Sequence, residues 1–528
     1  MNIVLVHPYI KVRVVETYLS EPLGLLCLAS HLDAVFNDNV NVAILDLYAL
    51  GAMNPKKEGD SYCLGINDPD FIANELERLK PDLIGIHCNF TAYAEDSLEV
   101  ASIVKQCMPE VPIVIGGAHP TIEGDSILKD YKCIDYVAKG EGEIILEHLV
   151  RALKGEMNIS NVNGLSYRKD IGAELVSNDL IAGGDDDIIV NNPMALIKDL
   201  DSLPIPNRNY IDMDKYSYFN KQTIWYVRKK SIATIMTSRG CPYDCVFCST
   251  KVVWTRKWRH RSLENVFTEI QMLYDDYGIR EFVINDDQFM TRKKRIHAFC
   301  DYFIEKNLDI YFSVDAGISI WLVEKELLTK MKKAGFYSLR FPIETGSKKT
   351  LEYVGKPVDL EKAKDLIDTA NQLGFWTSSN IIVGFPYETR EDILESIQYA
   401  YDSSLDFTSF LIAHPNAGAK MYDDFQKEGL MGRQVVRGSD FYSCDYDTVN
   451  LKAKEISDMV REASENWFAH KFKFYLKPRN FYNFFLPKIK NMGDFRYLVM
   501  IFFTLVNRKI KPVIVSKLSQ RMPGLKGK

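Results

Sequence analysis

The sequence predicts an α/β protein in which a Rossmann-like domain precedes a partial (β/α)6 barrel of the TIM type and a helical C-terminal region. Short apolar runs alternate with helical patterns over residues 1–150, and the alternation returns after residue 229. Helical periodicity then returns at residues 452–468. The expected boundaries are 1–150 for the first domain, 151–229 for a connector, 230–420 for the barrel and 421–528 for the C-terminal region.

Five apolar runs in the first domain have the length of buried strands. They alternate with helical patterns such as residues 23–34 and 71–79. Strands of this kind pair in parallel, with helices on both faces of the sheet. The runs are 3–6, 42–45, 83–86, 113–115 and 136–138.

Unusual residues follow several of these strands. Asn89 comes after the third strand, GGAHPT (116–121) after the fourth and KGEGE (139–143) after the fifth. Ligands of open parallel sheets bind at the carboxyl ends of the strands, and glycines there permit close approach. One Gly-Gly pair also fits an ordinary turn, but several such loops together favour a ligand site. No G-x-G-x-x-G follows the first strand, which argues against a nicotinamide or flavin dinucleotide.

The connector loses the alternation and gains Pro, Asn and Asp, as expected for a linking segment with some hairpin structure. Six strand-like runs with adjacent amphipathic helices follow it, which is the size of a partial barrel. Chemistry in such a barrel lies at the carboxyl ends of the strands. The runs are 232–236, 281–284, 310–314, 338–341, 377–383 and 409–413.

Three cysteines follow the first barrel strand at the spacing C-x3-C-x2-C: Cys241, Cys245 and Cys248. A structural zinc site wants four protein ligands, so the trio is one short. Three unrelated buried cysteines are the other alternative, which the crowding with Gly240 and Pro242 disfavours. A [4Fe-4S] cluster held by three thiolates leaves one iron open for a small ligand. The trio therefore predicts a substrate-binding cluster.

This motif, with Phe247 before the third cysteine, resembles the radical S-adenosylmethionine (SAM) superfamily. The resemblance implies that the open iron is chelated by the amino and carboxylate groups of SAM, whose reductive cleavage gives a radical that abstracts hydrogen. It also implies SAM contacts from four later positions. These are Asp286 or Asp287 in NDDQF, Glu344 in IETGS, Asn380, and Gly384 in GFPYE.

The order of the domains resembles the cobalamin-binding branch of that superfamily, over about residues 1–415. The resemblance implies cobalamin at the carboxyl edge of the first sheet. EPLG at 21–24 and the two glycine loops carry it. The implied binding residues are Glu21, Gly24, Asn89, Gly116, Gly117, His119, Gly142 and Glu143.

The cobalt ligand of many cobalamin domains lies in a D-x-H-x-x-G motif after the first strand. Here the segment after that strand reads HPYIK (7–11), and DLYALG (46–51) has Tyr in place of His and follows a different strand. We therefore expect cobalt without that histidine, and we keep His7 only as a weaker alternative.

The reaction implied by this branch is methyl transfer from SAM through methylcobalamin to an unactivated carbon or to phosphorus of a small substrate. The enzymatic alternative is an oxidative cyclisation like that of anaerobic magnesium-protoporphyrin monomethyl ester cyclase, which this domain order also resembles. A non-catalytic cobalamin or iron-sulfur carrier is the alternative of another class, but it would not need the SAM-like motifs. RNA methylthiotransferases carry three further cysteines that bind a cluster, and the other cysteines of this chain do not have that arrangement. The catalytic residues for the substrate are not identifiable from the sequence.

Composition adds expectations about location and partners. Residues 1–9 have the pattern of a strand, unlike a signal peptide, and most of the ten cysteines are scattered singly, so we expect reduced thiols and a cytoplasmic protein. The net charge of −6 gives no reason to expect nucleic acid as a partner. The expected partners are a small-molecule substrate and a reductant such as flavodoxin or ferredoxin.

Charge is distributed unevenly along the chain. Residues 467–528 contain 14 Lys or Arg and one acidic residue, with many aromatic residues. The longest uncharged apolar run there, YLVMIFFTLV at 497–506, is half of the ~20 residues needed to span a bilayer. This tail could pack on the main body, cover an anionic or lipid-like substrate, or contact an anionic membrane surface peripherally. Helical periodicity at 452–468 further predicts a cap over the barrel mouth, which would favour a hydrophobic substrate.

Overall fold

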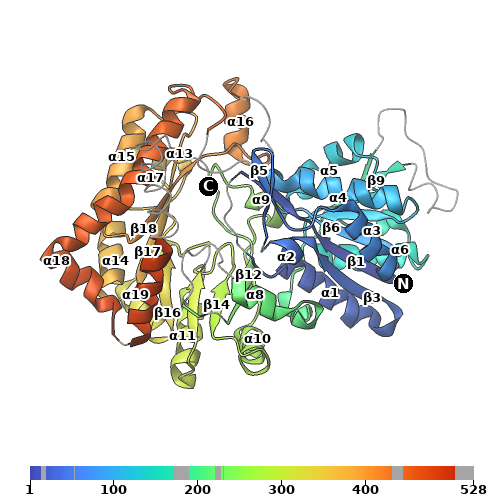
Figure 1. Cartoon of the computed structure of the whole chain (residues 1–528), viewed down its shortest axis with the longest axis horizontal. Coiled ribbons are helices and arrows are strands. Elements are labelled where there is room, and N and C mark those ends of the chain that lie inside the picture. Colours follow the sequence, from blue (N-terminus) through green and yellow to red (C-terminus); the bar gives the residue numbers. More distant parts are fainter. Residues whose placement is uncertain are drawn as a thin grey trace, which may run out of the picture.

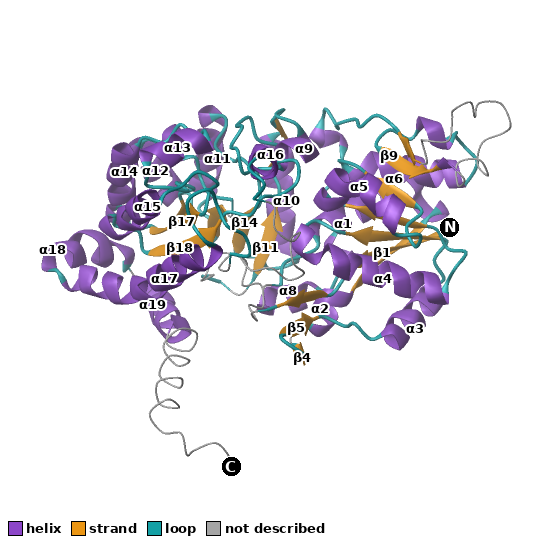
Figure 2. Cartoon of the chain, turned by 90° about the horizontal axis from the view of Figure 1, so that it is seen from above, coloured by secondary structure: helices purple, strands orange, loops and turns teal. Residues whose placement is uncertain are grey.

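A computed structural model describes residues 1–13, 19–52, 54–169, 189–219, 228–229, 231–314, 316–430, 444–490 and 492–505. Two sheets form the cores of two α/β units that lie side by side, with the N-terminal unit on the right of Figure 1. The C-terminal helices lie on the opposite side of the barrel from the N-terminal unit (Figures 1 and 2). The α/β fold class expected from the sequence is confirmed.

The N-terminal sheet has seven strands in the order β10-β9-β8-β7-β6-β1-β3. The five neighbouring strands β8, β7, β6, β1 and β3 pair in parallel. Each of the five predicted apolar runs forms one of these strands. The strands are β1 (Asn2–His7), β3 (Asn41–Asp46), β6 (Leu83–His87), β7 (Ile113–Gly116), β8 (Tyr136–Ala138), β9 (Leu165–Arg168) and β10 (Ile189–Asn191).

Helices cover both faces of this sheet because the strand side chains alternate between two apolar cores. Ile3 and Leu5 of β1 belong to the core under α1 (Leu23–Phe36) and α6 (Gly142–Leu153). Val4 and Val6 belong to the opposite core. The helices over that second core are α3 (Pro69–Leu79), α4 (Ala94–Cys107) and α5 (Ala118–Asp130).

The connector begins later than residue 151, because β9 and β10 extend the first sheet. Both pair antiparallel, β9 with β8 and β10 with β9, which is the hairpin character expected for this segment. A small antiparallel sheet that the sequence did not predict lies beside β1 and consists of β2 (Ile10–Val12), β4 (Lys56–Glu58) and β5 (Ser61–Leu64). The short helices α2 (Leu47–Gly51) and α8 (Met213–Phe219) complete this region.

The second sheet contains six parallel strands in chain order, as the alternation predicted. Within the described residues no pairing joins the last strand to the first, so the barrel is partial. The strands are β11 (Ile232–Ile235), β14 (Glu281–Ile284), β15 (Tyr311–Val314), β16 (Phe336–Arg340), β17 (Trp376–Val383) and β18 (Phe407–Ile412). A two-stranded ribbon, β12 (Ser238–Arg239) with β13 (Arg259–His260), follows β11.

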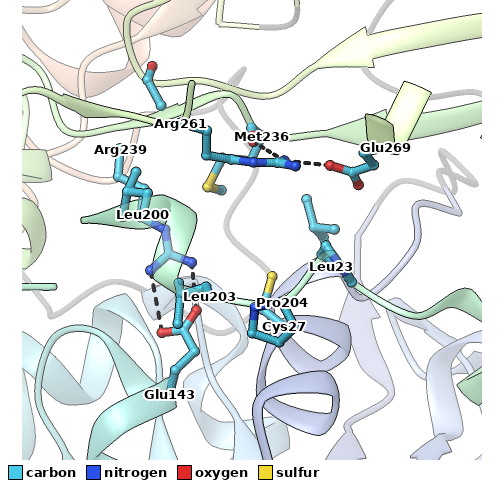
Figure 3. Close-up of a pocket in the computed structure, with 12 residues that line it drawn as sticks. Leu23, Cys27, Glu143, Leu200, Leu203, Pro204, Met236, Arg239, Arg261 and Glu269 are labelled. Carbon is cyan, nitrogen blue, oxygen red and sulfur yellow. Dashed lines mark hydrogen bonds and ion pairs between the residues drawn. The ribbon is translucent and has the colours of Figure 1, made fainter. Parts of the chain in front are cut away.

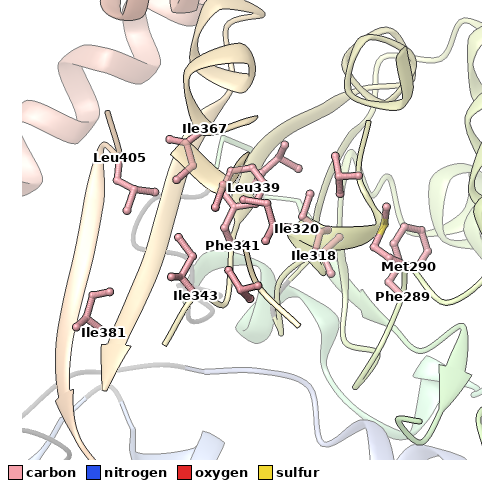
Figure 4. Packing of buried hydrophobic residues seen from close by; sticks show 14 of the residues in the cluster. Phe289, Met290, Ile318, Ile320, Leu339, Phe341, Ile343, Ile367, Ile381 and Leu405 are labelled. Atoms are coloured by element: carbon pink, nitrogen blue, oxygen red, sulfur yellow. The ribbon is translucent and has the colours of Figure 1, made fainter. Parts of the chain in front are cut away.

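Helices pack around the outside of the barrel sheet and form one continuous apolar core with it. Figure 4 shows part of this core, where Leu339 and Phe341 lie near Ile367. The helices are α9 (Thr250–Trp254), α10 (Leu263–Asp276), α11 (Lys293–Lys306), α12 (Lys325–Lys333), α13 (Lys348–Val354), α14 (Leu360–Gln372), α15 (Arg390–Asp402) and α16 (Lys420–Lys427).

The C-terminal region is helical, and its role as a cap over the barrel mouth stays a prediction. The long helix α17 (Ala453–Leu476) runs along the edge strand β18, where Trp467 contacts Phe410. The last helix, α19 (Met492–Leu505), packs Tyr497 against Tyr337 and Trp376, near the amino ends of β16 and β17. No helix among the described residues has the length and apolarity to cross a membrane.

Candidate functional site

The three cysteines lie in the loop between β12 and α9, beyond the carboxyl end of β11. Cys245 is buried, while Cys241 and Cys248 are partly exposed, and the amide of Cys248 donates to the Cys245 carbonyl over 3.0 Å. Burial raises the pKa of the Cys245 thiol to about 12. Metal binding therefore has to displace protons from this loop.

Contacts with two distant segments hold the loop in place. The Val246 amide donates to the Val354 carbonyl at the end of α13, and the Val246 carbonyl accepts from the Met421 amide at 2.8 Å. Gly240 enters the loop with φ +86°, where a Cβ atom would lie 2.6 Å from the Lys257 carbonyl oxygen. The loop is thus a fixed element of the barrel mouth.

The donor set suits a cluster better than a single ion. No three His, Cys, Asp or Glu side chains among the described residues are close enough together to hold one metal ion. A cubane cluster separates its thiolates much more widely than one tetrahedral ion does, and thiolates are the ligands that iron-sulfur clusters use. Cys241, Cys245 and Cys248 could hold a [4Fe-4S] cluster in this loop.

The two carboxylates after β14 differ in availability. Asp286 is buried and accepts three hydrogen bonds of 2.6 Å, from the Thr237 amide and from the hydroxyls of Thr237 and Ser238. Asp287 accepts from the Gly240 amide at 3.1 Å, next to Cys241, and its side chain is otherwise exposed. Of the two, Asp287 is therefore the one able to bind an ammonium group at the cysteine loop.

Glu344 has an unusual backbone and a buried cationic partner. Its φ is +70°, a region that a non-glycine residue rarely adopts, and its backbone bridges to β17 at Ile381. Its Oε1 accepts from Lys356 Nζ at 2.5 Å. That ammonium lies 5.7 Å from the ring centroid of Phe247 and also donates to the Pro342 carbonyl. No local sequence pattern pointed to Lys356.

Asn380 and the GFPYE segment lie at the end of β17. The Asn380 carbonyl accepts from the Glu344 amide, and no hydrogen bond of its side-chain amide is found among the described residues. Gly384 has φ +85°, and its amide and that of Phe385 both donate to Glu388 Oε2. Phe385 in turn contacts the ring of Phe247. The structure thus brings Phe247, Glu344, Asn380 and Gly384 to the rim of the cysteine loop.

The expected cobalamin edge of the N-terminal sheet is built around Gly117. This residue has φ +124°, and a Cβ atom there would lie 2.5 Å from the Cys88 carbonyl oxygen, so only glycine fits. Gly116 precedes it as the last residue of β7. Asn89 accepts from the Ala118 amide, and His119 Nδ1 lies 3.2 Å from the Thr91 hydroxyl.

The same edge offers a large exposed ring and two histidines. Phe90 is 64% exposed, which suits the covering of a flat apolar ligand. His7 Nδ1 lies 3.1 Å from Asp46, whose other carboxylate oxygen accepts from Tyr216 at 2.5 Å. His87 lies edge-on to His7, and burial together with His7 lowers the pKa of His87 to about 3. These residues fit a large, mostly uncharged group.

Glu21 and Glu143 do not face that edge. Figure 3 shows Glu143 bound by Arg239 beneath a pocket between the two units. Arg239 Nη2 donates to Glu143 at 2.5 Å and Nη1 donates to Glu141 at 2.7 Å. Burial alone would lower the pKa of Arg239, but Glu143 and Glu141 raise it above its usual value. The carboxylates of Glu141 and Glu143 therefore hold the N-terminal unit to the barrel.

Arg208, which is fully buried, forms the second part of this interface. Its Nη1 donates to Glu269 of α10 at 2.6 Å, and its Nε lies 3.5 Å from Glu21. Glu21 also accepts from the Thr234 amide in β11, 213 residues away in the chain. Burial raises the pKa of Glu21 to about 7, because Arg208 offsets only part of the cost.

The two glycines expected beside these carboxylates differ in their surroundings. Gly142 begins α6, and a Cβ atom there would lie 2.9 Å from the Leu28 side chain of α1. Gly24 lies in α1 with open space where its Cβ would be. The assignments of all these positions to cofactor binding stay predictions.

The cysteine loop and the carboxyl edge of the N-terminal sheet are neighbours. Helix α9, which begins two residues after Cys248, packs against α5, which begins directly after Gly117. Gly418 lies between them, since a Cβ atom there would lie 2.8 Å from Val252 and 3.7 Å from Ile122. Two groups bound at these two places would therefore lie close together.

Comparisons with protein families agree with this geometry. Residues 235–400 match the family described as the radical SAM superfamily, and residues 12–150 match the B12 binding domain. The first match contains the cysteine loop and the strands from β14 to β17, and the second contains Gly117. Each matched segment falls within one of the two units of the structure.

Relatives with curated descriptions cover most of the chain. An uncharacterized methyltransferase of Pyrococcus horikoshii is 30% identical over 411 residues, which are 77% of this chain and 82% of the relative. Cytidylyl-2-hydroxyethylphosphonate methyltransferase of Streptomyces wedmorensis is 29% identical and covers 78% of both chains. Anaerobic magnesium-protoporphyrin IX monomethyl ester cyclase of Rubrivivax gelatinosus is 27% identical, over 66% of this chain and 59% of the relative.

Two solved structures share the fold. OxsB, a cobalamin-dependent S-adenosylmethionine radical enzyme solved with aqua-cobalamin and SAM, superposes with a TM-score of 0.65 at 16% identity, covering 99% of this chain and 75% of that chain. The radical SAM methyltransferase TsrM from Kitasatospora setae gives a TM-score of 0.62 at 16% identity, over 82% of this chain and 77% of that chain.

Proposed function

This chain belongs to the cobalamin-dependent radical SAM enzymes, and on that premise we propose that it transfers a methyl group from SAM to an unactivated carbon or phosphorus of a small substrate. The observation that carries the proposal is the packing of α5 on α9, which brings the carboxyl edge of the N-terminal sheet next to the cysteine loop. A methyl carrier and a radical source must both reach one substrate, so adjacency of their sites is the geometry that this reaction needs.

When bound, the cluster and SAM supply a hydrogen-abstracting radical, and cobalamin supplies the methyl group. In the proposal the thiolates of Cys241, Cys245 and Cys248 hold the cluster. Asp287 accepts hydrogen bonds from the amino group of SAM. The side-chain amide of Asn380, for which the described residues provide no hydrogen bond, orients the nucleoside beside the turn at Gly384.

Lys356 and Glu344 set the charge around the cysteine loop. The ammonium lies between the carboxylate of Glu344 and the ring of Phe247, beside a cluster that carries negative charge when three thiolates bind it. The positive charge of the Lys356 ammonium favours reduction of the cluster. Because the ion pair is fixed, it needs no rearrangement during turnover. Both side chains are mostly shielded from water.

At the neighbouring edge, the chain provides a shaped surface for cobalamin. The positive φ of Gly117 lets the backbone approach the ligand, and the exposed ring of Phe90 gives an apolar contact. Asn89 and His119 supply polar atoms beside it.

The substrate in this proposal is a small molecule, and its apolar or lipid-like character is a hypothesis that rests on the composition of the C-terminal region. The reductant is a low-potential carrier such as flavodoxin or ferredoxin. Thiolate-bound iron-sulfur clusters require a reducing compartment, which favours the cytoplasm.

Product analysis under anaerobic conditions tests this function. The full chain is reconstituted with iron, sulfide and cobalamin, given SAM and a strong reductant, and assayed for 5′-deoxyadenosine and S-adenosylhomocysteine by mass spectrometry. Both nucleosides are expected, since methyl transfer leaves S-adenosylhomocysteine and hydrogen abstraction leaves 5′-deoxyadenosine. Omitting cobalamin should abolish S-adenosylhomocysteine and leave 5′-deoxyadenosine.

Two other outcomes would replace the proposal. Deoxyadenosine without S-adenosylhomocysteine would favour an oxidative reaction like that of the cyclase relative from Rubrivivax gelatinosus. If protein that retains iron and cobalamin forms neither nucleoside, the result would favour a non-catalytic carrier. The methyltransferase is preferred because the two methyltransferase relatives match over 82% and 78% of their own lengths, against 59% for the cyclase.

A further inference from the structure

Large hydrophobic side chains are exposed densely on the C-terminal helices. Of the fourteen that are exposed in the described part of the chain, eight lie between residues 472 and 500, and the other six are scattered from residue 50 to residue 449. Single exposed apolar residues are normal on soluble proteins, but a concentration of this kind marks an interaction surface. The eight residues, here called the C-terminal apolar surface, are Phe472, Leu476, Phe481, Tyr482, Leu486, Met492, Phe495 and Met500.

Between residues 472 and 500, where this surface lies, the exposed charges have one sign. Exposed basic side chains are interspersed with the eight apolar ones: Lys473, Lys477, Arg479, Lys490 and Arg496. The sequence from residue 466 to 528 contains a single acid, Asp494. Asp494 is buried and lies 2.5 Å from Arg228, so it adds no negative charge to the surface.

The opposite sides of the same helices are anchored to the barrel. Lys488 is buried and donates to Asp406 at 2.9 Å and to the Phe375 carbonyl at 2.8 Å. Lys471 donates from a buried position to the Ser403 carbonyl at 2.6 Å. These contacts fix which faces of the helices point outward. The anchored region lies at the amino ends of the barrel strands and along β18, away from the cysteine loop (Figure 1).

We propose that the C-terminal apolar surface docks on the anionic surface of a lipid bilayer, with its aromatic and aliphatic side chains in the interfacial layer. Apolar side chains flanked by Lys and Arg, without exposed acids, are what an anionic membrane surface attracts. Aromatic residues such as Tyr482 and Phe495 favour the boundary between headgroups and acyl chains. The surface would hold the enzyme at the bilayer without any segment crossing it.

A second copy of the chain fits this surface less well than a membrane does. A twofold contact presents the same patch from both partners, so the five exposed cations of one copy would meet those of the other. Like charges placed across an interface disfavour association. The last residues of the chain, 506–528, add seven further Lys or Arg and no acid, which strengthens the same preference for an anionic partner.

Sedimentation with vesicles tests the proposal. The full-length, cluster-reconstituted protein is mixed with vesicles of phosphatidylcholine alone or of phosphatidylcholine with phosphatidylglycerol. We expect binding to the anionic vesicles at low salt, little binding to the neutral ones, and a loss of about tenfold or more in binding at ~0.5 M salt because the charges are screened. Failure of the wild-type protein to bind anionic vesicles at low salt would overturn the proposal.

Matched variants separate the apolar from the ionic part. The triple variant Phe481→Ser, Tyr482→Ser, Phe495→Ser should lose about tenfold or more in vesicle binding, whereas Leu394→Ser, an exposed apolar residue on α15, should lose none. Reversal of charge in Lys473→Glu, Lys477→Glu, Arg479→Glu should have a similar effect, with Lys362→Glu as its control. All variants should keep wild-type SAM cleavage, which shows that they fold.

Oligomeric state provides the opposing outcome. Light scattering across a range of protein concentrations should show the same oligomeric state for the wild-type protein and for the variant with the Phe481, Tyr482 and Phe495 substitutions. A dimer that these substitutions dissociate, in a protein that ignores anionic vesicles, would assign the surface to a second copy. Vesicle binding equal in the triple variant and in Leu394→Ser would also overturn the proposal, since the apolar surface would then contribute nothing.

Discussion

Lys356 Nζ lies 2.5 Å from Glu344 Oε1, and both side chains are more than nine-tenths shielded from water. The pair joins the segment after β16 to the segment after α13, directly beside the ring of Phe247 in the cysteine loop. A buried ion pair is sensitive to the loss of one partner, because the other is left as an uncompensated buried charge. The relationship can therefore be tested by single and double substitution.

Replacing Lys356 with Met should destabilise the barrel by about 3–5 kcal/mol, because the Glu344 carboxylate loses its partner. The double variant Lys356→Met, Glu344→Gln should recover much of this loss. Thermal unfolding of the reconstituted proteins measures the effect, with the exposed Lys348→Met as control. Equal unfolding midpoints for Lys356→Met and Lys348→Met would show that the pair does not stabilise the fold.

The cysteine loop should account for the bound iron. Cys241→Ala, Cys245→Ala and Cys248→Ala should each lose the cluster and all 5′-deoxyadenosine formation, since a cubane held by two protein thiolates is poorly retained. Cys107→Ala, which removes an exposed cysteine on α4, should keep the full iron content. Iron and sulfide analysis decides the matter, and full iron content in the three loop variants would remove these cysteines from the cluster.

Two glycine substitutions distinguish the cobalamin edge from the helix behind it. Gly117→Ala should distort the turn, because the new Cβ would meet the Cys88 carbonyl at 2.5 Å in a backbone region that alanine avoids, and cobalamin retention after gel filtration should fall about tenfold or more. Gly155→Ala should retain cobalamin, because Gly155 also has a positive φ, +75°, but lies in open space just past the end of α6. Equal retention by both variants would place the ligand elsewhere.

The interface between the two units should depend on Arg239. Arg239→Met leaves Glu141 and Glu143 without this partner, which should loosen the interface by about 3 kcal/mol and speed proteolysis of the connector about tenfold or more. Arg78→Met removes an exposed ion pair on α3 and should change neither. Unchanged proteolysis of the Arg239 variant would mean that apolar packing alone holds the units together.

Stability should fall as pH rises between about 4.5 and 7. Burial raises the pKa of Glu281 from its usual value of 4.5 to about 7, despite hydrogen bonds from Tyr337 and two backbone amides. Between those values the folded chain holds a proton that the unfolded chain has lost, so this group favours folding below pH 4.5 and ceases to do so above pH 7. One such group contributes a slope of up to about 1.4 kcal/mol per pH unit.

Glu281→Gln should therefore flatten the pH dependence of unfolding in that window, while Glu361→Gln, on the exposed side of α14, should leave it unchanged. Denaturant unfolding at several pH values gives the slopes. A wild-type slope that is retained in Glu281→Gln would assign it to Glu21 or Glu388, whose pKa values burial also raises to about 7.

The strands of both sheets were predictable because each is a short apolar run, and the eleven predicted runs all form strands. The small sheet of β2, β4 and β5 could not be predicted, because its strands have only three or four residues and one of them, Lys56-Lys57-Glu58, is charged throughout. The first domain also extends past residue 150, since β9 and β10 pair with β8. The cap over the barrel mouth stays a prediction, because periodicity gives a helix an apolar face but does not say what that face covers.

The sequence by itself determined the order of the two α/β units and placed three cysteines in one loop, because strand length, helix periodicity and the C-x3-C-x2-C spacing are local properties. Only the tertiary structure decided which polar side chains are engaged. In the folded chain, Asp286 accepts three hydrogen bonds, whereas Asp287 accepts one and is otherwise exposed. Glu143 pairs with Arg239, which lies 96 residues further along the chain. The tertiary structure also brings Lys356 to the cysteine loop. Contacts of this kind depend on how separate elements pack, and no short stretch of sequence encodes them.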